Sequence, residues 1–170
     1  MADLRNKLKS QENLLEKLTR LIPGFSGYKD REIRRVADKL QRDYMATRLA
    51  EARRPLLDVS TRVLEGGGLH LMEEFDRLQK RLDKVRDRLR LGEYGYSGFF
   101  DAVKIGNKEL DRLYEYDLTL VNKVNAFCDE ARKLTDQEKD LKKKLVPLES
   151  MLDELDNLVS ARHEIMIEVG

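Results

Sequence analysis

The feature that most constrains the fold is a regular alternation of three- and four-residue steps between apolar side chains. In residues 69–91 the alternation has no gap, and charged residues fill most of the other positions. This spacing puts the apolar side chains on one narrow seam of an α-helix, and such a seam is buried against other helices. The seam of this segment consists of Leu71, Phe75, Leu78, Leu82, Val85 and Leu89.

Two earlier segments carry the same pattern. Residues 3–22 have a seam in which Gln11 fills one place. Residues 29–65 carry two apolar stripes that are shifted around the helix surface, and Pro55 predicts a kink or a break. The first stripe contains Ile33, Val36, Leu40 and Tyr44, and the second contains Met45, Leu49, Ala52, Leu56, Val59 and Val63.

The longest seam lies in the C-terminal part of the chain. It begins near Asn107 and keeps its phase as far as Val159, with interruptions only at Asp117 and Glu138. It predicts about 75 Å of helix, since each residue adds about 1.5 Å. Pro147 lies off the seam, so it either bends this helix or opens a separate fifth helix as its first residue.

The composition agrees with long exposed helices. Charged residues make up 38% of the chain, against roughly 25% in typical globular domains, and three prolines with ten glycines are few for a sheet protein. We therefore predict an all-α fold, an elongated antiparallel helical bundle of four to five helices with coiled-coil segments. Its expected parts are an N-terminal coiled-coil helix (1–22), a central bundle (29–135) and an acidic coiled-coil segment (136–170) that packs with residues 1–22 or with another copy.

The charge and the cysteine content limit which partners and which cellular compartment are expected. The net charge is +1, so no overall field recruits nucleic acid or an anionic membrane. Residues 1–22 carry an excess of basic side chains and residues 107–170 an excess of acids, so the two are complementary within one molecule or between copies. The single cysteine, the polar N-terminal segment and the lack of an apolar run of about 18 residues predict a cytoplasmic protein, or one peripheral to the inner face of the membrane.

A short glycine-aromatic motif occurs twice. Residues 24–28 (GFSGY) recur as residues 95–99 (GYSGF), each time between two expected helices. In an up-down bundle the first and third helices point the same way, so we expect both motifs at the same end. The pair indicates a pseudo-repeat of two helical hairpins.

Two longer sequence boxes resemble a family of prokaryotic all-helical proteins. LIPGFSGYKDREIRRVADKLQRD (residues 21–43) and YGYSGFFDAVKIGNKELDRLYEYD (residues 94–117) are similar to its LIPG-x-x-GY-x-x-RE-x-RR-x-ADK and YGY-x-GFFDAVK boxes. The resemblance covers about residues 15–134, and both boxes occur in order. The family has no established activity, so the resemblance implies a helical fold and no particular reaction.

The sequence motifs for metal, nucleotide and nucleophilic chemistry are incomplete. His70 and His163 lack a second histidine at zincin spacing and a glutamate three residues before them, so neither a zinc nor a di-iron site is predicted. The glycine loops lack the Lys-Ser/Thr of a phosphate-binding loop. Ser26 and Ser97 lie one residue short of a nucleophile elbow, so we assign them to turns or helix caps. We expect no catalytic residue, no cofactor and no metal.

Two carboxylates and a cysteine lie on or beside the long seam. A buried carboxylate needs a partner, so Asp117 and Glu138 predict register control, with a basic side chain reaching in from another helix. Paired acid-base catalysis is the alternative, but the two residues would be about six turns apart on one helix. Cys128 fits a small buried hydrophobe, because Asp129 and Glu130 beside it raise the pKa of its thiol.

Two clusters of side chains are candidate contact surfaces. A basic cluster early in the second helix could grip the phosphates of lipid or nucleic acid, but its interleaved acids also fit a salt-bridged face. A low-charge aromatic loop could plug the end of the bundle, or contact a partner or a membrane. The basic cluster contains Lys29, Arg31, Arg34, Arg35, Lys39 and Arg42, and the apolar loop set contains Phe25, Tyr28, Tyr94, Tyr96, Phe99 and Phe100.

Together these features predict a non-enzymatic scaffold or protein–protein interaction protein that acts through coiled-coil seams. The expected partner is another copy of the chain or a second helical protein, and we expect a homo-oligomer. One alternative is a peripheral stress scaffold on an anionic membrane surface, resembling phage-shock protein A, although the seam of residues 3–22 is narrow and lacks aromatic anchors. Phosphate or nucleic-acid binding through the basic cluster is the other alternative, and nucleic acid is the less favoured partner.

Overall fold

The computed structural model describes residues 2–92, 97–137 and 139–169, and all regular secondary structure in this part of the chain is helical. The all-α prediction is confirmed, with six α-helices among these residues rather than the expected four to five. The elements, in chain order, are α1 (Ala2–Leu21), the 3-10 turn η1 (Arg31–Ile33), α2 (Arg34–Glu65), the 3-10 turn η2 (Leu69–Leu71), α3 (Met72–Arg90), the short α4 (Ser97–Asp101), α5 (Asn107–Lys133) and α6 (Leu141–Val169).

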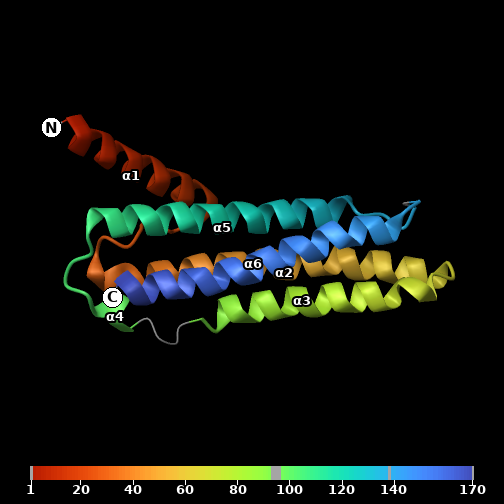
Figure 1. The fold of residues 1–170 in the computed structure, drawn as a ribbon. Helices are drawn as coiled ribbons and strands as arrows, with labels where there is room; N and C mark the ends of the chain where they lie inside the picture. The colour runs from red at the N-terminus through yellow and green to blue at the C-terminus, as the bar shows by residue number, and fades with distance from the viewer. Residues whose placement is uncertain (1, 93–96, 138, 170) are drawn as a thin grey trace.

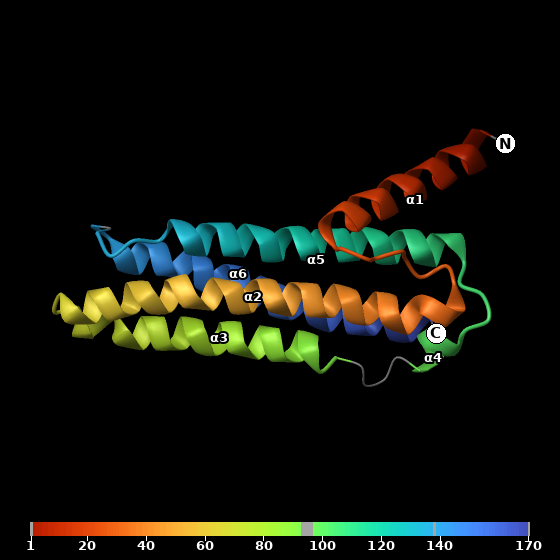
Figure 2. The same cartoon turned by 180° about the vertical axis from the view of Figure 1, so that it is seen from behind.

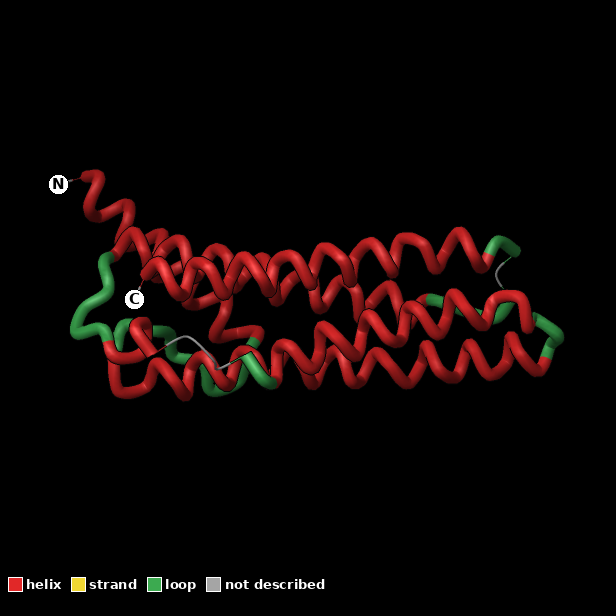
Figure 3. The backbone as a smooth tube through the Cα atoms, turned by 60° about the horizontal axis from the view of Figure 1, so that its bottom comes forward, coloured by secondary structure: helices red, strands yellow, loops and turns green. Residues whose placement is uncertain are grey.

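Four of the helices form an elongated bundle, built from the hairpins α2–α3 and α5–α6 (Figure 1). Within each hairpin the helices run antiparallel, but the two hairpins lie side by side in the same orientation, so α3 is parallel to α6 and α2 to α5. The register shows this directly, because Arg77, Arg81 and Lys84 of α3 each bond the residue 72 positions later on α6. Figure 3 shows that most of the loops gather at the two ends of the bundle.

The long C-terminal seam is not one helix. It breaks after Lys133, where Leu134 is extended, and α6 begins at Leu141. A single helix of that length would leave much of its seam without a partner in the same chain, whereas the reversal packs the seam of α6 against α5 and α3. Both Leu134 and Leu141 are buried, so the seven-residue phase persists across the loop although the chain changes direction.

The two prolines that were expected to bend or start helices lie inside them. Pro55 lies within α2 and Pro147 within α6, and each helix continues through its proline. A proline removes one backbone hydrogen bond from a helix. In α2 the neighbouring Ala52 and Leu56 are fully buried in the core, and this packing offsets the loss.

Helix α1 lies outside the bundle and packs on α5, and its N-terminal half extends away from the other helices (Figures 1 and 2). After α1 the chain runs back toward the end of the bundle before α2 begins, so α1 and α3 point in opposite directions rather than the same way. Within the chain, α6 packs on α5 and α3, and the packing of residues 136–170 with residues 1–22 or with another copy stays a prediction. No described helix is long and apolar enough to cross a bilayer.

Candidate functional site

A tight turn after α1 places an aromatic ring in the bundle interior. Gly27 has φ +88°, and a Cβ there would lie 2.5 Å from the hydroxyl oxygen of Tyr114, so only glycine fits. The next residue, Tyr28, is fully buried, and its backbone N–H donates to the Tyr114 hydroxyl at 2.9 Å. The rings of Tyr28 and Tyr114 are stacked, with centroids 5.7 Å apart. The segment between α1 and α2 is therefore anchored to α5 by a specific contact.

The centre of the site is Arg162 of α6, which is 2% exposed and bonds residues of three other segments. Its Nε donates to Asp117 Oδ1 of α5 at 2.8 Å. Its Nη2 donates to Asp38 Oδ1 and Gln41 Oε1 of α2, both at 2.8 Å, and to the Tyr28 hydroxyl at 3.1 Å. One guanidinium thus joins α2, α5, α6 and the turn before α2.

The Tyr28 hydroxyl closes the network from the other side. Its oxygen lies 2.6 Å from Gln41 Oε1 and 2.7 Å from Asp117 Oδ2, and its one proton is donated to one of these two acceptors at a time. Burial, together with the negative charge of Asp117, raises the pKa of the Tyr28 phenol well above its ordinary value. Burial alone would lower the pKa of the Arg162 guanidinium, but the carboxylates of Asp117 and Asp38 raise it well above its ordinary value. The arginine therefore stays charged and the phenol stays protonated.

A second buried arginine connects this network to the end of α3. Arg42 Nε donates to Asp38 Oδ2 at 2.8 Å, and its Nη1 donates to the carbonyls of Leu89 and Arg90 at 3.0 and 3.1 Å. Carbonyls in the last turn of a helix have no intrahelical partner, so Arg42 satisfies two of them. Asp38 thus divides its two oxygens between Arg42 and Arg162.

A third buried arginine, Arg34, holds the turn and α4 together. Its Nε donates to the Tyr28 carbonyl at 2.7 Å, and its Nη1 donates to the carbonyls of Phe99 and Ala102 at 3.3 and 2.5 Å. The Tyr28 and Phe99 rings pack edge-to-face, with their centroids 5.4 Å apart. This contact brings Tyr28 of the first glycine-aromatic motif and Phe99 of the second to the same end of the bundle, although the first and third helices do not run the same way.

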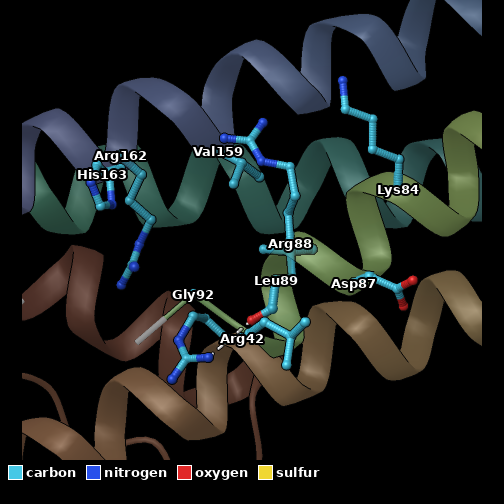
Figure 4. A pocket seen from close by; sticks show the side chains of 10 residues that line it. Arg42, Lys84, Asp87, Arg88, Leu89, Gly92, Val159, Arg162 and His163 are labelled. Carbon is cyan, nitrogen blue, oxygen red and sulfur yellow. Dashed lines mark hydrogen bonds between the residues drawn. The ribbon is translucent and has the colours of Figure 1, made fainter. Parts of the chain in front are cut away.

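A cavity of about 470 Å³ lies next to the network, between α2, α6 and the C-terminal end of α3 (Figure 4). Arg42 from α2 and Arg162 from α6 approach it from different sides, and the dashed line in Figure 4 joins Arg42 to the Leu89 carbonyl. The residues that line the cavity are Arg42, Lys84, Asp87, Arg88, Leu89, Leu91, Gly92, Val159, Arg162 and His163.

The cations of the cavity wall are already engaged. Arg88 Nη1 bonds the Asp156 carboxylate and carbonyl, and its Nη2 donates to Ser160 Oγ at 2.9 Å. Lys84 Nζ donates to Asp156 Oδ2 at 2.9 Å. Burial raises the pKa of the Asp156 carboxyl, but the hydrogen bonds from Lys84 and Arg88 outweigh this effect and lower the pKa below its ordinary value. Since each of these cations is bonded to Asp38, Asp117 or Asp156, the cavity is not a free anion-binding site.

The predicted basic cluster is divided between the interior and the surface. Arg34 and Arg42 are 1% and 2% exposed and bond carbonyls and Asp38, so they cannot grip an external phosphate. Arg35 lies over the Phe100 ring, 4.6 Å from its centroid, and 3.9 Å from Asp101. The exposed members of the cluster are Lys29, Arg31, Arg35 and Lys39.

The predicted apolar loop set lies mostly inside the molecule. Phe25, Tyr28, Phe99 and Phe100 are buried and form edge-to-face contacts with one another. These four side chains fill the end of the bundle and are not an exposed contact surface. Tyr94 and Tyr96, the other two members, lie outside the described residues.

The expectation for Asp117 is confirmed in its geometry, because a basic side chain, Arg162, reaches it from another helix. Glu138, its proposed partner in acid-base catalysis, lies outside the described residues. Cys128 is fully buried, as expected, and burial raises the pKa of its thiol to about 11 while Arg48 opposes the shift. The thiol donates to the Arg48 carbonyl at 3.2 Å.

Asp38, Gln41 and Arg162 were not among the predicted residues, although the sequence contains a signal for Asp38 and Arg162. Arg162 follows Val159 by three residues, so it occupies the next seam position of α6. In α2 the stripe from Met45 onward, continued backward in the same steps, reaches Arg42 and Asp38 rather than the apolar residues that we chose. The first stripe is confirmed only in part: Leu40 and Tyr44 are half-buried and pack against the core, whereas Val36 is 59% exposed.

Among the described residues, no group of three or more histidine, cysteine, aspartate or glutamate side chains is arranged to hold a metal ion. No protein-family model matches the chain, and neither a curated protein nor a solved structure shows significant similarity to it. The arguments about function therefore depend on the residues and their geometry.

Proposed function

We propose that the protein is a non-enzymatic helical scaffold or protein–protein interaction protein, which acts in the cytoplasm or at the inner face of the membrane. The observation that carries this proposal is the incomplete burial of the α1 seam. Leu18 and Ile22 at its C-terminal end are buried, whereas Leu8 is 43% and Leu4 is 67% exposed. A seam that continues beyond the surface that covers it offers a site for another helix.

The buried charge network supports the same proposal. Its carboxylates are each bonded to arginine, and the bonds link helices rather than converge on the cavity. Such a network fixes which helices pack together and in which register. We assign it the role of holding a rigid bundle, from which α1 projects.

The membrane and nucleic-acid alternatives have less support. The exposed part of α1 presents two leucines and no aromatic residue, whereas helices that lie in a membrane interface need a broad apolar face. Two of the six arginines and lysines in the basic cluster are buried and engaged. No observation on the described residues favours either alternative over a helical partner.

The experiment replaces both exposed leucines by polar residues. We expect Leu4→Asn with Leu8→Asn to abolish the association of the protein, either with itself in sedimentation velocity or with proteins that co-purify with the tagged chain. The matched control is Leu57→Asn with Leu64→Asn on α2, because these leucines are 43% and 47% exposed. Unchanged association in the α1 variant, with a wild-type urea midpoint, would contradict the proposal.

A further inference from the structure

The exposed half of α1 combines two leucines with basic residues. Leu4 and Leu8 are one turn apart, and the basic side chains around them are Arg5, Lys7 and Lys9, all exposed. Lys7 has one exposed ion pair, with Asp3 at 3.5 Å, which contributes little to stability. This half of α1 is therefore an apolar stripe with a basic border.

The stripe faces a cleft that the chain does not fill. The cleft has a volume of about 340 Å³ and lies between α1 and the start of α5, where Gln11 Nε2 donates to the Asn107 carbonyl at 2.6 Å. Leu4 and Leu8 form its apolar wall, and α6 contributes no residue to it. The residues that line it are Leu4, Lys7, Leu8, Gln11, Gly106, Asn107, Lys108 and Glu109.

The C-terminal end of α6 has the complementary pattern. Ile167 is 53% exposed, and the exposed acids Glu164 and Glu168 lie three residues before it and one residue after it. Glu168 bonds Arg112 at 3.0 Å, but both side chains are more than half exposed, so the pair is easily exchanged. This end of α6 is an apolar residue with an acidic border.

The α1 stripe and the end of α6 do not pack against each other within one molecule, because α1 lies outside the bundle on α5. Both are at the same end of the molecule in Figures 1 and 2. A two-fold axis at that end would let each α1 meet the α6 of the other copy, which makes two equal contacts at once. Opposite charges then border both contacts.

We infer that the partner of the exposed half of α1 is the C-terminal end of α6 in a second copy of the chain, an inference that rests on the proposed function. The protein is then a reciprocal dimer in which Leu4 and Leu8 pack on Ile167 of the other copy, and Arg5, Lys7 and Lys9 face Glu164 and Glu168. The contact is small and charged at its border, so salt weakens it. Raising the ionic strength from about 0.01 M to about 1 M shortens the Debye length from about 30 Å to about 3 Å.

The test is a charge reversal with rescue, followed by sedimentation equilibrium of the purified full chain. We expect Arg5→Glu, Lys7→Glu and Lys9→Glu together to weaken dimerisation about tenfold or more, and Glu164→Lys with Glu168→Lys to do the same. The chain that carries all five substitutions should dimerise again. The control reverses three exposed cations elsewhere, Arg54→Glu, Lys139→Glu and Lys144→Glu, and should dimerise like the wild type.

Circular dichroism and urea midpoints separate a loss of contact from a loss of folding. If the variant with all five substitutions does not dimerise, while both parent variants fold, the inference is overturned. A wild-type chain that stays monomeric at every concentration also overturns it, including a monomer that binds anionic vesicles instead. In each of these cases, loss of a co-purifying protein in the Leu4→Asn, Leu8→Asn variant would still support the proposed function, so the two failures are distinguishable.

Discussion

The four-helix bundle and the exposed half of α1 carry the same seam pattern but differ in what covers it. In the bundle, Leu82, Val124 and Leu152 are each at most 1% exposed, and the buried charges are paired across helices. In α1, Leu4 and Leu8 remain exposed. This difference shows that a repeat of three- and four-residue steps predicts a helix that needs a partner. The repeat does not predict whether that partner lies in the same chain.

The largest effect is expected from breaking the charge network. Arg162→Ala leaves Asp38 and Asp117 buried with fewer partners, and removing one side of a buried ion pair costs about 3–5 kcal/mol. Urea denaturation measures the loss. A loss of under about 1 kcal/mol would show that water reaches the site and that the network does not hold the bundle together.

A double-mutant cycle sharpens this prediction. The double variant Asp117→Leu, Arg162→Met removes the buried carboxylate of Asp117 and the guanidinium that it bonds. Asp38 keeps its bond to Arg42. We expect the double variant to be more stable than Arg162→Met alone, by about 2 kcal/mol. Additive losses would mean that the two side chains act independently.

A large effect is also expected from the apolar core of the bundle. Leu78 of α3 is fully buried, so Leu78→Ala should cost about 3 kcal/mol through lost burial and the cavity left behind. Leu57→Ala, on the exposed face of α2, is the control and should change the free energy of unfolding by no more than about 0.5 kcal/mol. Equal losses at the two positions would contradict the assignment of the core.

The buried thiol of Cys128 predicts that the stability of the protein falls at alkaline pH. The pKa of the Cys128 thiol is raised from its ordinary 9.0 to about 11. Between these two values the unfolded chain releases the thiol proton first, so the free energy of unfolding falls as the pH rises above about 9. Cys128→Ala should lose this part of the slope in urea midpoints measured from pH 7 to pH 11. If the pH dependence of stability in Cys128→Ala is identical to that of the wild type, the thiol is exposed to water in the folded protein.

The smallest effect is expected from the ion pairs on the surface between α3 and α6. Arg77 bonds Glu149 at 3.1 Å, and its side chain is 44% exposed. Arg77→Ala should cost less than about 1 kcal/mol, and added salt should reduce the difference further. A larger loss, insensitive to salt, would mean that these pairs contribute to the bundle as the interior network does.

The sequence was sufficient to predict the helices but not their arrangement. The step pattern is the same whether a chain continues or reverses, and the loop between Lys133 and Leu141 contains neither glycine nor proline to mark the turn. The direction of α1 was equally hidden, because it depends on how the segment after α1 runs back to the end of the bundle. Local spacing contains no information about either choice.

The site was predictable only in part, for a related reason. Asp117 was recognised because it interrupts a long apolar seam, and the prediction of a basic partner followed from the cost of burying a carboxylate. Arg162, Asp38 and Gln41 were missed because we took the apolar residues for the buried ones. Where buried polar side chains bond one another, as Arg162 and Asp117 do, burial no longer follows hydrophobicity.

The most direct test of the contrast between the bundle and α1 is amide hydrogen exchange at low and high protein concentration. We expect strong protection in α2, α3, α5 and in α6 before its last turns at both concentrations. Protection of residues 2–10 and of the last turns of α6 should rise with concentration, because only these surfaces are completed by association. Protection of residues 2–10 that is equal at both concentrations would contradict the role that we assign to α1.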